Sequence, residues 1–258
     1  MFDDPVGSFI PVRSPVFDLT RMGIIRLEQK TPVGTLMSAP ALDYLKAIEH
    51  LPDGAMLRLE NISWDEYERL LEEVGEWPGV RISYDRGRVE IKSPTTEHEE
   101  YKDFILRVVH ILAEELGVAL ESRGSSTFKR ERLLKGAEPD ACFYVRNAAA
   151  IVGKRRIDLS VDPPPDLVVE VDITNESLSK FPIYVALDVP EIWRYDGNET
   201  CIYHLVGSAY VQTPASRSFP VLTAIAITDA IEQSKTEGQS AALADFRQWV
   251  RTTMAPEP

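Results

Sequence analysis

Residues 138–145 read EPDACFYV, and residues 163–193 read PPPDLVVEVDITNESLSKFPIYVALDVPEIW. Each stretch contains a short apolar segment typical of a buried strand, and each segment also carries acids. These acids are Asp140, Glu170 and Asp172. A buried charge is unfavourable unless it is paired or binds a metal. The pattern therefore predicts that the two strands end at a functional site.

The clearest strand is expected at residues 167–173. Period-two geometry places Val168, Glu170 and Asp172 on one face and four apolar side chains on the other. Such a strand suits the centre of a sheet whose end opens onto a site. From residue 96 onward, the expected order is helix, strand, irregular crossing, strand, crossing, strand, helix, strand. This alternation predicts an α/β fold with a mixed sheet flanked by helices.

Helical periodicity and turn residues predict the other elements. A capping box begins at Ser63, a second box with the same spacing begins at Thr96, and Gly117 is suited to end the second helix. The expected helices span residues 39–50, 64–74, 96–116, 177–187, 228–234 and 240–250. The expected strands, besides 167–173, span residues 81–85, 88–92, 118–121, 139–145, 191–195, 201–206 and 209–213.

Composition limits the function classes. A chain of 258 residues with a net charge of -13 does not match a protein that coats nucleic acid through a broad basic surface, although a local basic groove stays open. Two cysteines are too few for a disulfide framework, and their spacing is not that of a metal site. The sequence shows neither a signal peptide nor an apolar run of membrane-spanning length, so we expect a cytoplasmic protein without a membrane partner.

The acids favour a hard divalent cation such as magnesium, which needs only one or two carboxylates. Asp140 and Glu170 would bind the ion, with the backbone carbonyl of Val171 as a third ligand. Lys180 could orient a water molecule or stabilise charge in the transition state. Glu97 and His98 lie at the start of a helix and could complete the site through water or as a base.

Each of these residues also has a structural alternative. Asp172 could begin a turn, and Lys180 could be a solvated helix lysine. Glu97 could favour the positive end of its helix, and His98 could pack or cap there. For Glu170 the structural alternative is weaker, because a glutamate between two valines in mid-strand is seldom structural.

Several stretches together resemble a known family. They are RVEIKSPTTEHE at 88–99, GSSTFKR at 124–130, EPDACFYV at 138–145, DPPPDLVVEVDIT at 162–174, Lys180 with Tyr184, and VPEIWRYD at 189–196. In this order they resemble the Uma-two family of putative restriction endonucleases, within the PD-(D/E)XK nuclease superfamily. The resemblance runs from about residue 63 to 220. It implies a restriction-endonuclease-like fold, a divalent metal and phosphodiester hydrolysis.

The resemblance also assigns roles to residues. Asp140 matches the Asp of the PD motif, Glu170 matches the acid of (D/E)XK, and Glu97 or His98 occupies the region of the first-helix acid. Where the superfamily has its lysine, this chain has Asp172. The resemblance therefore implies that Lys180, or else Lys129, delivers the amine from elsewhere.

We therefore predict a magnesium- or manganese-dependent endonuclease that acts on DNA. The expected catalytic residues are Asp140, Glu170, Asp172, Lys180, Glu97 and His98. The alternatives are a catalytically degenerate binding or regulatory module on the same fold, and a hydrolase of another phosphoester. The choice between DNA and RNA stays open, and so does a homodimer.

The expected organisation has three parts. An N-terminal arm with a short helix would occupy residues 1–60, and the nuclease-like domain would occupy residues 61–220. A helical extension packed on that domain would occupy residues 221–258.

Overall fold

The strand at the centre of the fold is β9, Leu167–Val171, all five residues of which are buried. The computed structural model describes residues 24–27, 41–75, 79–173 and 178–254. In it, β9 pairs in parallel with β10, Glu191–Tyr195, and antiparallel with β8, Ala141–Tyr144. A strand covered on both faces is expected to be rich in Val and Leu, as β9 is. The acid Glu170 is the exception in this strand.

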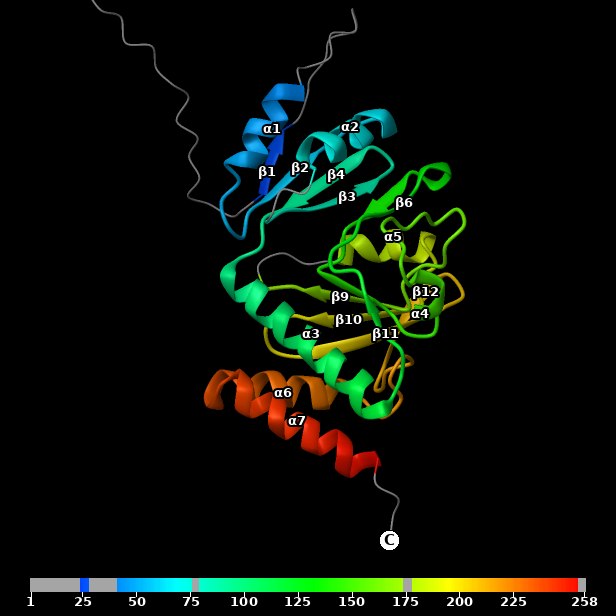
Figure 1. Ribbon diagram of the computed structural model, residues 1–258. Coiled ribbons are helices and arrows are strands. Elements are labelled where there is room, and N and C mark those ends of the chain that lie inside the picture. The colour runs from blue at the N-terminus through cyan, green and yellow to red at the C-terminus, as the bar shows by residue number, and fades with distance from the viewer. Residues whose placement is uncertain (1–23, 28–40, 76–78, 174–177, 255–258) are drawn as a thin grey trace, which may run out of the picture.

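Two six-stranded sheets form within the described residues (Figure 1). Sheet A has the order β1-β2-β4-β3-β7-β6, and sheet B has the order β12-β11-β10-β9-β8-β5. Each contains one parallel pair, β1 with β2 and β9 with β10. The strands of sheet A are β1 Ile24–Leu27, β2 Met56–Leu59, β3 Arg81–Asp85, β4 Arg88–Lys92, β6 Phe128–Arg130 and β7 Lys135–Ala137. The other strands of sheet B are β5 Glu121–Ser122, β8 Ala141–Tyr144, β10 Glu191–Tyr195, β11 Thr200–Val206 and β12 Ala209–Thr213.

Helices cover both sheets. Helix α2 packs its apolar stripe on sheet A, and α5 packs against β7 and β12 (Figure 1). On sheet B, α3 packs on β9 and α6 packs on β11, and α7 packs on both of these helices. The helices are α1 Ala41–Glu49, α2 Trp64–Val74, α3 Thr96–Leu116, α4 Ala148–Ile151, α5 Phe181–Ala186, α6 Ala224–Glu237 and α7 Gln239–Met254, with short 3₁₀ turns η1 Glu131–Leu133 and η2 Leu178–Lys180.

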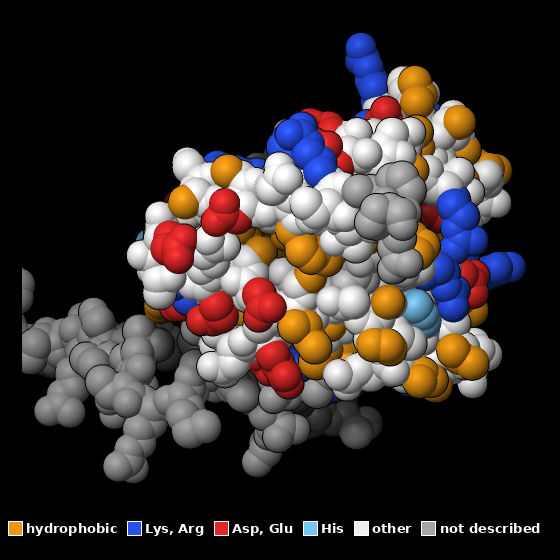
Figure 2. Space-filling model, turned by 90° about the horizontal axis from the view of Figure 1, so that it is seen from below, with side chains coloured by type: hydrophobic (Ala, Val, Ile, Leu, Met, Phe, Trp, Pro, Cys, Tyr) orange, Lys and Arg blue, Asp and Glu red, His pale blue; other side chains and the backbone are white. Residues whose placement is uncertain are grey.

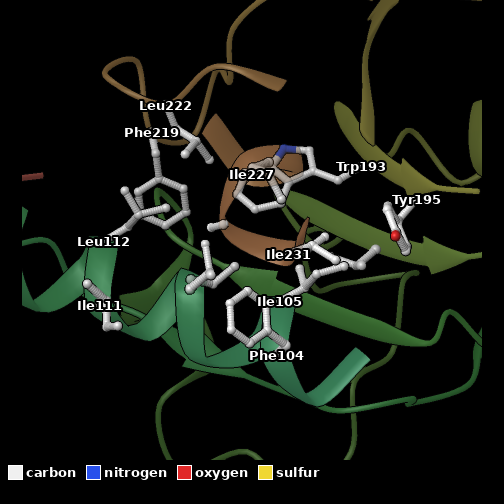
Figure 3. Packing of buried hydrophobic residues seen from close by; sticks show 14 of the residues in the cluster. Phe104, Ile105, Ile111, Leu112, Trp193, Tyr195, Phe219, Leu222, Ile227 and Ile231 are labelled. Atoms are coloured by element: carbon white, nitrogen blue, oxygen red, sulfur yellow. The ribbon is translucent and has the colours of Figure 1, made fainter. Parts of the chain in front are cut away.

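The main core lies between sheet B and helices α3, α6 and α7. Figure 3 shows Phe104 and Ile105 of α3 facing Trp193 of β10 and Ile227 and Ile231 of α6. Burial of a side chain of this size stabilises a fold by about 1.5–3 kcal/mol. The two C-terminal helices are therefore part of the same core as the strands that carry the acids.

The two faces of β9 follow the predicted alternation. Leu167, Val169 and Val171 pack into the core under α3, whereas Val168 packs on the opposite side with α5. Glu170 lies on the α5 side as well, where it contacts residues that precede and form that helix. The position of the site therefore follows from the period of the strand.

The predicted α/β class and mixed sheet are confirmed, with two sheets in place of one. The 81–92 hairpin and the Ser63 capping box form as predicted. The cap of α3 is Thr95 rather than Thr96, and the strand expected at 118–121 is only β5, shifted toward the C-terminus. Strands β6 and β7 were not predicted, because three-residue strands carry too little periodicity. Helices α6 and α7 are longer than predicted.

Of the arm predicted for residues 1–60, residues 1–23 and 28–40 lie outside the described residues, as do residues 174–177, and the three-part division of the chain stays a prediction. Among the described helices, none combines the length and the apolar character that crossing a bilayer requires. Both cysteines are buried and unbridged.

Candidate active site

Asp140 lies directly before β8 and is held by its neighbours from two other elements. Its Oδ2 accepts a hydrogen bond from the backbone N–H of Val171 at 2.8 Å, and Nε2 of His98 lies 3.0 Å from the same oxygen. Burial alone would raise the pKa of Asp140, but the His98 hydrogen bond and the Lys180 charge hold it well below its usual range. Asp140 is therefore ionised in the folded protein.

Glu170 and Lys180 form the most deeply buried ion pair of the site. The Lys180 ammonium donates to Oε1 and Oε2 of Glu170 at 3.0 and 2.9 Å, and their side chains are 2% and 1% exposed. The ammonium also donates to the backbone carbonyl of Glu138 at 2.9 Å. The hydroxyl of Tyr184 donates to Oε1 of Glu170. The Lys180 ammonium is therefore held in one orientation by three acceptor oxygens, two from Glu170 and one from the backbone of Glu138.

The local sequence explains how Lys180 reaches β9. Lys180 ends η2 and immediately precedes α5, which carries Pro182 in its first turn. Proline there fixes the helical backbone without the loss of a hydrogen bond. Tyr184 follows Lys180 by four residues, so both side chains lie on one face of the helical segment. That face is the one that meets Glu170.

Burial sets the protonation of this pair. Burial raises the pKa of Glu170 to about 7, although the positive charge of Lys180 opposes this shift. For Lys180, burial would lower the pKa, but the carboxylates of Glu170 and Asp140 raise it. Lys180 therefore remains an ammonium. Glu170 is the member of the pair that gains or loses a proton near neutral pH.

The first turn of α3 brings His98 into the site. Thr95 caps the helix by accepting a hydrogen bond from the His98 N–H. Burial opposes the charged form of His98, but the neighbouring carboxylates of Asp140 and Glu99, 3.0 and 3.4 Å from its ring nitrogens, raise its pKa to about 9. Glu97 is exposed and accepts a hydrogen bond from Tyr101. The acid of this turn that contacts His98 is therefore Glu99, which sequence reasoning missed.

A small hollow lies between Asp140 and Glu170, and two cations that sequence reasoning also missed line it. Arg81 lies with its Nε 3.9 Å from Oδ1 of Asp140, and Lys92 borders the space between Asp140 and Glu170. Burial lowers the pKa of Lys92, and the nearby Lys180 charge adds to this shift. The alternation of β4 could have indicated Lys92, because Val89 and Ile91 occupy the opposite face.

Asp172 and Lys129 have other partners. Asp172 lies at the end of β9, where Nε of Arg194 donates to its Oδ2 at 2.5 Å. Lys129 pairs with Glu68 of α2, on the other face of sheet A from the site. Of the two lysines considered for the missing position, only Lys180 therefore reaches the carboxylates.

The residues of the hollow fit a hard divalent cation. Asp140, Glu170 and Val171 border a space of about 20 Å³, enough for one body the size of a water molecule. Two carboxylates and one backbone carbonyl are an oxygen donor set that magnesium accepts. Within the described residues no cluster of three or more acid, His or Cys side chains has metal-binding geometry. Any bound cation would therefore depend on this small set and on water.

Comparison with known families decides the classification. The sequence model of the Uma2 family, described as "Putative restriction endonuclease", matches residues 64–232. The chain belongs to this family. The match begins at the first residue of α2 and ends inside α6, so it includes both sheets apart from β1 and β2 and every residue of the site.

Other comparisons add little to the Uma2 assignment. One solved structure, a putative nuclease belonging to DUF820 from Anabaena variabilis ATCC 29413, is similar to this chain, with 13% identity and a TM-score of 0.42. The similarity covers 57% of this chain and 89% of that one. Among the curated proteins, none matches this chain.

Proposed function

We propose that this member of the Uma2 family is a divalent-metal-dependent endonuclease that hydrolyses phosphodiester bonds of DNA. The observation that carries the proposal is the position of the Lys180 amine, 2.9 Å from Glu170 in a site shared with Asp140. An amine at this point compensates for Asp172 at the usual lysine position. A Lys180 side chain directed into solvent would have left Glu170 without the ammonium that donates to both of its oxygens.

The chain's own residues would divide the work. Asp140, Glu170 and the carbonyl of Val171 would hold magnesium or manganese, which supplies a Lewis acid for charge on a phosphoryl oxygen. Lys180 fixes the orientation of the Glu170 carboxylate and contributes positive charge beside the reacting phosphate. Tyr184 donates to Oε1 of the same carboxylate and so restricts it further. His98 fixes Asp140 and excludes one direction of approach by water.

The direct test is cleavage of supercoiled plasmid, linear duplex and RNA with magnesium or manganese. Asp140→Asn, Glu170→Gln and Lys180→Met should each lower the rate by at least about 100-fold, the scale of losing one fixed electrostatic contact. Glu115→Gln is the matched control, because Glu115 is also an ion-paired carboxylate but lies on α3 against α7. Metal-dependent cutting that persists in both carboxylate variants would exclude this assignment.

A second function, a non-catalytic binding module on the same fold, has one specific observation in its favour. The Glu170 carboxylate already accepts from Lys180 and Tyr184, and Asp140 already accepts from Val171 and is paired with His98. Such saturation suits a permanent internal pair as well as a catalytic one. Titration calorimetry separates the two, since absence of magnesium or manganese binding at millimolar concentration supports the module.

A further inference from the structure

The two faces of sheet A differ in chemistry. One face carries the apolar side chains that pack under α2, including Leu57, Ile82 and Val89. The register places Arg58 opposite Glu90, and Arg81 opposite Lys92, so these side chains share the other face. That second face, called the polar face here, is turned toward η2 and the site, since Glu90 accepts from Ser179 at 2.8 Å.

The polar face is positively charged. Among the residues whose side chains the structure describes, it carries six cations and two carboxylates, a surplus of four positive charges in a chain whose net charge is -13. The cations are Arg58, Arg81, Arg88, Lys92, Arg130 and Lys135, and the carboxylates are Asp85 and Glu90. A local field of this sign attracts anions even when the whole molecule is acidic.

Structural pairing accounts for three of these cations, of which Arg81 lies 3.6 Å from Glu99 and 3.9 Å from Asp140. Arg130 donates to the carbonyl of Ala186 at 2.9 Å, and Lys135 pairs with Asp85 at 2.5 Å. Their side chains are only 13% and 8% exposed. Arg130 connects sheet A to the end of α5, and Lys135 pairs with the residue at the β3–β4 turn. Little of either side chain is accessible to a ligand.

The more exposed cations lie on the other half of the sheet. Arg58 and Arg88 are 29% and 36% exposed, and both pair with the single buried carboxylate of Glu90, at 2.7 and 3.8 Å. One carboxylate does not neutralise two guanidinium groups, so this cluster retains positive charge. Its anchor through Glu90 and Ser179 holds it beside the segment that carries Lys180.

Strand β4 connects this cluster to the carboxylates of the site. Arg88, Glu90 and Lys92 occupy alternate positions, and Lys92 lines the hollow with Asp140 and Glu170. Four residues of strand span about 13 Å. This length corresponds to about four nucleotides along the axis of a duplex. The cations therefore form a row that begins at the site and leads away from it.

We propose that this row, from Lys92 to Arg88 and Arg58, binds the phosphate backbone of a nucleic acid on one side of the bond to be cleaved. The assignment rests on the proposed function for its link to cleavage, but not for binding itself. Charge complementarity commits it to a polyanion. At the opposite end of the molecule, where α6 and α7 lie, acidic side chains gather on the left of Figure 2.

The test measures binding by fluorescence polarisation, with a dye-labelled DNA duplex and the corresponding single strand. EDTA prevents cleavage, and salt is varied between about 50 and 200 mM. Arg88→Gln should lower the slope of log affinity against log salt by about 0.7–0.9, and the affinity at 0.1 M salt by about five- to eight-fold. Arg88→Lys should restore most of the slope, and Arg88→Glu should weaken binding further.

Arg251→Gln is the matched control. Arg251 also shares a carboxylate with a second arginine, since it and Arg247 both pair with Glu115, but it lies on α7. Its slope should equal that of the wild type. An unchanged slope in Arg88→Gln and Arg88→Glu, or a wild type that binds neither probe, would overturn the assignment.

Cleavage measured in parallel keeps the two proposals separate. If the wild type cuts DNA, but the salt dependence of binding is the same in the Arg88 variants, the phosphate-binding row is refuted and the nuclease proposal stands. If the Arg88 variants change binding, but the wild type cuts no substrate, the nuclease proposal is refuted and the phosphate-binding row stands.

Discussion

The ammonium of Lys180 donates to both carboxylate oxygens of Glu170, although the two residues belong to different elements and lie 10 positions apart. The amine therefore enters the site from η2 and not from β9. The strand position that would have carried it holds Asp172, which is paired with Arg194. Glu170 and Asp172 are thus each paired with a cation from a neighbouring element, Lys180 and Arg194.

The buried pair itself predicts a coupled effect on stability. Lys180→Met leaves Glu170 buried without its cation, so we expect a loss of about 3–5 kcal/mol in the free energy of unfolding at pH 8. Glu170→Gln with Lys180→Met should lose less than the sum of the single changes. Urea unfolding of the four proteins measures this coupling, and additive losses would contradict a direct interaction.

His98 predicts a pH dependence of stability. Its pKa is raised from 6.5 to about 9 in the folded protein, because Asp140 and Glu99 favour the charged ring. The stabilisation is therefore complete below pH 6.5 and is lost as the pH rises through 9. Thermal melts of the metal-free protein should show this decline. His98→Gln should remove it, and an identical decline in that variant would contradict the assignment.

Asp172 and Glu170 should respond differently to neutralisation. Asp172 pairs with Arg194, whose side chain is 13% exposed, and so acts through the position of β10. Asp172→Asn should therefore reduce cleavage much less than Glu170→Gln does. Arg194→Met, which leaves Asp172 buried, should destabilise the fold by about 3 kcal/mol. Equal losses of cleavage from both carboxylate changes would instead place Asp172 among the metal ligands.

Gly136 of β7 predicts a steric effect remote from the chemistry. A Cβ added at this position would overlap the Tyr67 hydroxyl of α2. Gly136→Ala should destabilise the protein by about 1–3 kcal/mol, as overpacking of a core does. Combination with Tyr67→Phe, which removes the hydroxyl, should recover part of that loss in a denaturant titration. No recovery would show that the overlap is relieved in another way.

The sequence allows prediction of those features that depend on local pattern. Alternation places Glu170 on the α5 side of β9, and capping residues locate the helix that carries His98 to within one position. The family resemblance identifies Asp140 and Glu170, and the Uma2 match confirms the family itself. Metal binding and the roles of the individual residues stay predictions.

Features that depend on packing between distant segments could not be predicted. The contact of Lys180 with Glu138 and Glu170 depends on how α5 docks between the sheets. The engagement of Lys129 by Glu68 depends on which face of β6 meets α2. The alternation of β3 and β4 gives the faces of Arg81 and Lys92, but only the packing of sheet A against β9 brings the two cations to the carboxylates of the site.

The contacts of the site also bear on how the chain is made. Asp140 and Val171 are 31 positions apart, and Glu138 and Lys180 are 42 apart. During synthesis from the N-terminus, a chain that has reached only β9 already contains both carboxylates and the cations Arg81, Lys92 and His98, but not Lys180, whose ammonium donates to Glu170. Closure of the ion pair must therefore await residues 178–184. Glu170 therefore gains the Lys180 and Tyr184 donors only after every strand of sheet A has been synthesised.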